Sequence, residues 1–114
     1  MSKLTAEQAR ELTAKAQLDI NNSIEGYIPD LIDLVIKDII KNANLAHTFT
    51  LIDVKKLAEL HAPMKIVLMS DFDNKYLDVI IWKLSMYMSG MGYKVSKPAA
   101  DILQIDWSEY ENFN

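Results

Sequence analysis

A strongly apolar stretch at residues 75–89 constrains the fold more than any other part of this sequence. Its apolar residues recur at the three- and four-residue spacing of an α-helix, and a second apolar stripe runs beside the first. A helix that is apolar around most of its circumference is either central in a domain or shared with a partner. The first face consists of Leu77, Ile80, Ile81, Leu84, Met88 and Met91, and the second stripe of Tyr76, Val79, Trp82 and Met86.

Two helices are predicted in the N-terminal part of the chain. The first begins with a capping-box pattern, Thr5 and Gln8, and we expect it to end near the polar residues 21–23 or at Gly26. Pro29 suits the first turn of a second helix, where its missing N–H costs nothing. The first helix has a narrow stripe of Leu12, Ala16, Ile20 and Ile24, and the second has an apolar face of Leu31, Ile32, Val35, Ile36, Ile39 and Ile40.

Short strands are predicted at residues 48–52, 64–69, 93–96 and 102–107, and Asp53 is expected to cap a short helix after the first of them. The residues Asp71 to Asn74 form a loop that ends in the cap of the apolar helix. The last two strands form a hairpin, with Leu103, Ile105 and Trp107 on one face. The fold class is therefore α+β: two N-terminal helices, a short strand, a short helix, a long apolar helix and a C-terminal β-hairpin, with a small antiparallel sheet packed on the helices.

The size of 114 residues predicts one compact domain over residues 1–114. The net charge is −4, and residues 101–114 hold four acidic and no basic side chains, so the chain has no basic stripe of the kind that binds nucleic acid. Cysteine is absent, which excludes disulfides and thiolate chemistry. No apolar run is long enough for a signal peptide or a membrane span, so we expect a cytoplasmic protein without membrane contact.

Catalytic and metal-binding patterns are missing. The two histidines, His47 and His61, have no third ligand marked by a motif. Asp71, Asp73 and Asn74 resemble the start of a calcium loop, but the required glycine and glutamate are replaced by Tyr76 and Trp82. The three glycines form no phosphate-binding pattern, and no serine has the context of a nucleophile. We therefore predict a protein that is not an enzyme and has no catalytic, cofactor or metal site.

Partner binding is predicted for two groups of residues. Trp82, Met86 and Tyr87 lie away from the expected core face of the apolar helix, and flexible thioethers suit adaptable interfaces. The alternative is that the methionines fill gaps in the core. Residues 107–114 form an acidic aromatic tail that is either a recognition segment or a flexible, solubilising terminus. Its candidate residues are Trp107, Glu109, Tyr110, Glu111 and Phe113.

The opening segment, Leu4 to Leu12, resembles the start of small accessory proteins of tailed bacteriophages. The closing unit is similar to them too, with a helix that leads to Gly92-Tyr93-Lys94-Val95 and a last strand from Ile102 to Trp107. Residues 53–73 then look like an insertion. The resemblance implies an early or anti-defence protein in the cytoplasm of a bacterial host cell, which binds and inhibits or redirects a bacterial protein.

Three other functions are compatible with the sequence. One is a winged-helix-like transcription regulator with Ser96-Lys97-Pro98 as its wing. Another is a self-assembling virion or structural component. The third is a protein that sequesters a small ligand such as a nucleotide. A small homo-oligomer is expected if the protein is the phage-type inhibitor or the self-assembling component.

Overall fold

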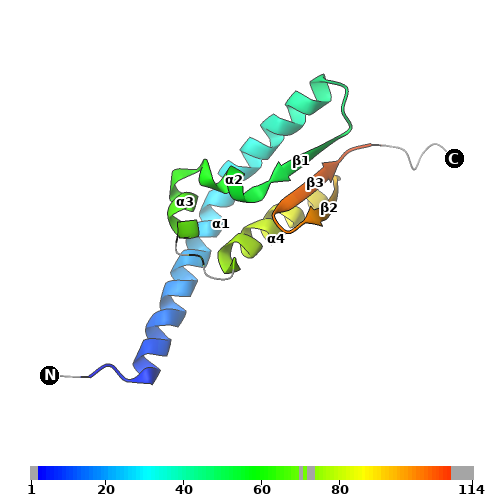
Figure 1. Ribbon diagram of the computed structural model, residues 1–114. Helices are drawn as coiled ribbons and strands as arrows, with labels where there is room; N and C mark the ends of the chain where they lie inside the picture. Colours follow the sequence, from blue (N-terminus) through cyan, green and yellow to red (C-terminus); the bar gives the residue numbers. More distant parts are fainter. Residues whose placement is uncertain (1–2, 70, 72–73, 109–114) are drawn as a thin grey trace.

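The computed structural model describes residues 3–69, 71 and 74–108, and it shows an α+β fold (Figure 1). Three strands form one antiparallel sheet in the order β1-β3-β2. The sheet packs on helices, and β1 and β2 are its two edge strands. The elements in chain order are α1 (Ala6–Asn44), β1 (Phe49–Asp53), α2 (Val54–Glu59), α3 (Ala62–Met69), α4 (Lys75–Gly90), β2 (Lys94–Ala99) and β3 (Ile102–Asp106).

The prediction of two N-terminal helices is wrong, because α1 is one helix of 39 residues that continues through Gly26 and Pro29. Its capping box is present as predicted: Thr5 Oγ1 accepts from Gln8 N at 3.1 Å, and Gln8 Oε1 accepts from Thr5 N at 3.0 Å. The helix is held on both sides of Pro29 by one buried face at helical spacing. That face is Ile24, Ile28, Leu31, Val35 and Ile39.

The first half of α1, residues 6–23, projects from the body and is here called the arm (Figure 1). It contains no buried residue, and Leu12 and Ala16, which were predicted to form its apolar stripe, are exposed. The fully buried face of α1 begins at Ile24, and Ile20, one turn earlier in the predicted stripe, is half-buried against the core. The molecule is consequently elongated, with extents of 72 × 28 × 22 Å. The sequence predicts one compact domain but does not predict the projecting arm.

Helix α4 is central, as its apolar sequence predicts. Leu77, Ile80, Leu84 and Met88 are buried against α1 and the sheet. Asn74 is the N-cap position of α4, as predicted, but its side chain makes no cap hydrogen bond. Instead, the Asp71 carboxylate accepts from Tyr76 N at 2.8 Å and Leu77 N at 2.9 Å, which satisfies two free donors of the first turn.

The hairpin that follows α4 was predicted nearly correctly. Gly92 has a φ of +98°, a left-handed conformation that glycine adopts without strain, and it leads the chain into β2. Leu103 and Ile105 of β3 face the core, as the alternation indicates. Residues 96–98, proposed as the wing of a DNA-binding protein, are part of strand β2 rather than a loop.

The prediction of a strand at residues 64–69 is also wrong, since this segment belongs to α3. Its burial has helical spacing: Met64 is buried and Val67 and Leu68 are half-buried, whereas Ile66 and Met69 are exposed. An apolar run of six residues is compatible with either structure when read alone. Pro63 in the first turn and the hydrogen bond from Lys65 N to His61 O, 2.9 Å long, favour the helix.

Candidate functional site

Three of the predicted partner-binding residues are exposed on α4: Trp82 and Met86 lie one turn apart on its outer side, and Tyr87 lies around the helix from them in its last turn. Trp82, Met86 and Tyr87 are exposed at 60%, 58% and 46% while the opposite side of the same helix is buried. Met91, predicted to face the core, is exposed as well, because the helix ends at Gly90 and Met91 is its C-cap. Together these four residues are called the α4 face.

The α4 face is anchored to α1 next to Trp82. The Lys83 ammonium group lies 5.9 Å from the centre of the Trp82 ring, and it also forms an ion pair with Glu25 of α1. A cation close to an aromatic ring is attracted by the electrons of the ring face. The contact fixes the aromatic residue from one side and leaves the rest of it open to a partner.

The structure does not bring Trp107 to the α4 face. The Trp107 ring meets Tyr93 edge-on, with centroids 6.3 Å apart, and the backbone N–H of Trp107 donates to Thr48 O at 2.9 Å. Trp107 is therefore half-buried at the end of the sheet and has a packing role. The other predicted tail residues, Glu109, Tyr110, Glu111 and Phe113, lie outside the described residues.

Just before Trp107, the Asp106 carboxylate is held in its ionised form. The pKa of Asp106 is lowered by the Ser108 hydroxyl beside it and by the Ser108 backbone N–H, which donates to Oδ1 at 2.7 Å. The positive charge of Lys94 lowers the pKa further, whereas desolvation of the carboxylate raises it. The hydroxyl oxygen makes no hydrogen bond of normal geometry, so we attribute the lowered pKa chiefly to the N–H. These contacts order the chain as it leaves β3.

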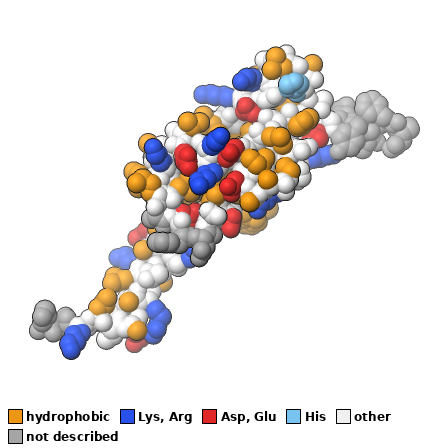
Figure 2. All heavy atoms as spheres, viewed as in Figure 1, with side chains coloured by type: hydrophobic (Ala, Val, Ile, Leu, Met, Phe, Trp, Pro, Cys, Tyr) orange, Lys and Arg blue, Asp and Glu red, His pale blue; other side chains and the backbone are white. Residues whose placement is uncertain are grey.

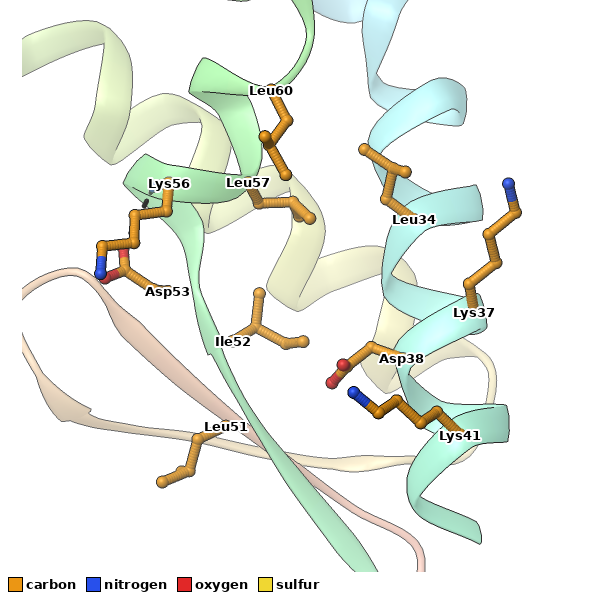
Figure 3. A pocket seen from close by; sticks show the side chains of 10 residues that line it. All are labelled: Leu34, Lys37, Asp38, Lys41, Leu51, Ile52, Asp53, Lys56, Leu57 and Leu60. Carbon is orange, nitrogen blue, oxygen red and sulfur yellow. Dashed lines mark hydrogen bonds between the residues drawn. The ribbon is translucent and has the colours of Figure 1, made fainter. Parts of the chain in front are cut away.

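A groove between α1, β1 and α2 was not predicted from the sequence (Figure 3). This α1–β1 groove has a volume of about 400 Å³. Its apolar walls come from all three elements, and three lysines and two aspartates stand among them. The apolar residues are Leu34, Leu51, Ile52, Leu57 and Leu60, and the charged ones are Lys37, Asp38, Lys41, Asp53 and Lys56.

The two carboxylates of the groove are engaged by neighbouring groups. Asp38 Oδ2 accepts a hydrogen bond from Thr50 Oγ1, and Asn42 Nδ2 donates to the same Thr50 oxygen at 3.1 Å. Asp53 caps α2 as predicted, accepting from Lys56 N at 3.1 Å. Within the described part of the chain, no carboxylate lies within ion-pair distance of any of the three lysines. The groove therefore presents ammonium groups that are free to meet an anion.

The two histidines make local contacts. His47 Nδ1 lies 2.9 Å from Asn42 Oδ1, and His61 Nε2 lies 3.1 Å from Asp30 Oδ2 while its ring packs on Tyr27. Among residues 3–69, 71 and 74–108, no three histidine or carboxylate side chains are placed to hold a metal ion. None of the helices over these same residues is both long and apolar enough to cross a membrane.

No protein-family model, curated protein or solved structure matches the chain. The α4 face and the α1–β1 groove therefore have to be interpreted from their own chemistry.

Proposed function

We propose that the chain is a non-enzymatic accessory protein of the phage type, which binds a bacterial protein and inhibits or redirects it. The observation that carries the proposal is the α4 face, where Trp82, Met86 and Tyr87 lie exposed on α4 and Met91 lies exposed at its C-cap. The resemblance of both ends of the chain to small phage proteins supports the type of partner.

The chemistry of the α4 face suits protein recognition. Tryptophan and tyrosine are enriched among the residues that dominate binding energy, and methionine adapts to irregular surfaces. Trp82 and Met86 are one helical turn apart and so present neighbouring anchors along one line, as in helices that bind in a groove of a partner. Their partner should therefore offer an apolar groove that receives one side of a helix.

Charging the centre of this surface should prevent binding. We expect Met86→Glu to weaken the interaction with the bacterial partner at least about tenfold, because the complex would bury an unpaired carboxylate. The partner would first be captured from bacterial lysate with the tagged protein and identified by mass spectrometry. The affinity of the purified pair would then be measured by isothermal titration calorimetry.

Met69→Glu is the matched control, since Met69 is 80% exposed on α3 and makes the same change of charge away from the α4 face. It should bind like the wild type. Equal affinity of Met86→Glu and the wild type would exclude the α4 face as the binding surface.

Self-assembly is a second candidate function, and the arm favours it. Helical segments in proteins owe most of their stability to a packed apolar face, but among the described residues the arm packs on the core only at its base, through the half-buried Ile20. Leu12 and Leu18 are both 60% exposed there (Figure 2 shows the projecting arm). The arm of a second copy of the chain could pack against these leucines and bury them in a symmetric dimer.

Leu12→Glu tests this candidate. If arms pair, the wild type should sediment above the 13.0 kDa protomer, and the variant should dissociate at least about tenfold more readily because the charge would enter the interface. Asn22→Glu, a charge change at an exposed polar position of the same arm, serves as the control. A wild-type protein that remains monomeric at all concentrations would rule out the pairing of arms.

A further inference from the structure

We infer that the α1–β1 groove binds an extended acidic peptide segment of a partner protein, which adds to the sheet as a strand beside β1. This site is separate from the α4 face and would recognise a different kind of structure. Three observations lead to it: the free backbone edge of β1, the apolar walls beside that edge, and the unpaired lysines of the groove.

Among the described residues, β1 pairs with another strand on one side only, the side of β3. Thr48 O accepts from Trp107 N, and Val54 N donates to Asp101 O, so the even-numbered residues from 48 to 54 direct their backbone groups toward β3. In an antiparallel pair the residues between them point the other way. The N–H and C=O groups of Phe49 and Leu51 therefore face outward from the sheet edge, where an added strand can pair with them. The C=O group of Asp53 is engaged by the first turn of α2, which Asp53 caps.

Apolar side chains border this edge. Leu51 of β1 and Leu60, the C-cap of α2, are largely exposed, and Leu34 and Leu57 lie deeper between α1 and α2 (Figure 3). An added strand directs every second side chain to the same face. Its alternate residues would thus enter the apolar part of the groove, and the five residues of β1 set a pairing length of about five residues.

The charges of the groove select an acidic ligand. Lys37 and Lys41 stand one turn apart on α1, and Lys56 lies across the groove on α2 (Figure 3). Asp38 already accepts a hydrogen bond from Thr50, and Asp53 accepts one from the backbone N–H of Lys56 in the first turn of α2. With three lysines and two aspartates the groove is net positive on a chain of net charge −4, and it therefore favours carboxylates over basic groups.

A yeast-displayed library of random twelve-residue peptides tests the inference with the full-length protein as bait. We expect the selected peptides to be acidic and to carry apolar residues at alternate positions. A selection that yields basic or unbiased peptides, or none, would overturn it. The strongest synthetic peptide, labelled with fluorescein, would then be measured by fluorescence anisotropy.

Two variants locate the bound peptide. The double variant Lys37→Glu/Lys41→Glu should weaken binding about tenfold or more, because two attractions become repulsions. Arg10→Glu/Lys15→Glu, a double charge reversal of the same size at exposed positions of the arm, should leave affinity unchanged. Circular dichroism would confirm that each variant is folded. Equal affinity of the double variant and the wild type would place the peptide elsewhere and overturn the inference.

The pairing with β1 has its own test. Methylation of alternate backbone nitrogens in the peptide should abolish binding in one register and spare it in the other, because only every second N–H of an added strand faces β1. Equal effects in both registers would contradict strand addition. Met86→Glu should leave peptide binding intact, so that failure of the α4 face and failure of the groove can be told apart.

If the occupant is instead a second copy of the chain, the selected peptide would dissociate an oligomer of the wild type, and sedimentation with and without peptide would reveal it. That result would overturn the assignment to a separate partner protein.

Discussion

Replacement of Leu84 by alanine should lower the free energy of unfolding by about 3 kcal/mol, within the range of 2–5 kcal/mol that is typical of buried leucines. Leu84 is fully buried on α4, where α1, α4 and the sheet meet. Its removal would both lose apolar burial and leave a cavity that close-packed neighbours fill only in part. Urea denaturation followed by circular dichroism would measure the change as a shift of the midpoint at constant m-value.

Met86→Ala is the control for this prediction because Met86 lies on the same helix, two residues along the chain, with its side chain exposed. It should change stability by no more than about 0.5 kcal/mol, as surface substitutions usually do. Equal losses for the two variants would mean that the helix is not packed on one side as described. The comparison also tests whether the α4 face can be altered without unfolding the protein.

Replacement of Pro29 by alanine should raise the free energy of unfolding by about 2 kcal/mol. Pro29 stands inside α1, where it lacks the N–H that would bond to the carbonyl group of Glu25, and its ring crowds that same group. Proline in a helix interior costs about 3 kcal/mol relative to alanine. Part of this gain is offset, because proline also restricts the unfolded chain by up to about 1 kcal/mol.

Urea denaturation would again provide the measurement, with Asn22→Ala as the control. Asn22 is exposed on the arm, so its replacement improves helix propensity by at most about 0.7 kcal/mol and adds no backbone hydrogen bond. A fall in stability of Pro29→Ala would show that the proline is required for the packing of α1, for example through a bend that directs the arm.

Pro29 also shows why the prediction of two N-terminal helices failed. Gly26, Pro29 and the polar cluster at residues 21–23 are local signals that favour a helix end, and each was interpreted correctly as a local preference. Ile24 and Ile28 on one side of the proline and Leu31 on the other are all buried against the same core. Their combined burial exceeds the cost of one lost hydrogen bond and one steric contact.

The strand predicted at residues 64–69 failed for a related reason. A strand must have a neighbour to pair with, and the sheet joins β1 to β3 across about fifty residues of sequence. No local pattern reveals which strands are neighbours. The α1–β1 groove escaped prediction in the same way, because Lys37 and Lys41 look like the solvated side of a helix until β1 and α2 are placed opposite them.

The features that depend on neighbours within a few residues follow from the sequence alone. These are the capping box at Thr5, the apolar helix at residues 75–89, the turn at Gly92, the alternation of β3 and hence the α+β class. Tertiary structure alone decided the continuity of α1, the projection of its arm, the helical form of α3 and the groove beside β1. The physical reason is that these features depend on burial and strand pairing between distant segments, whose free energies exceed the weak preferences of individual residues.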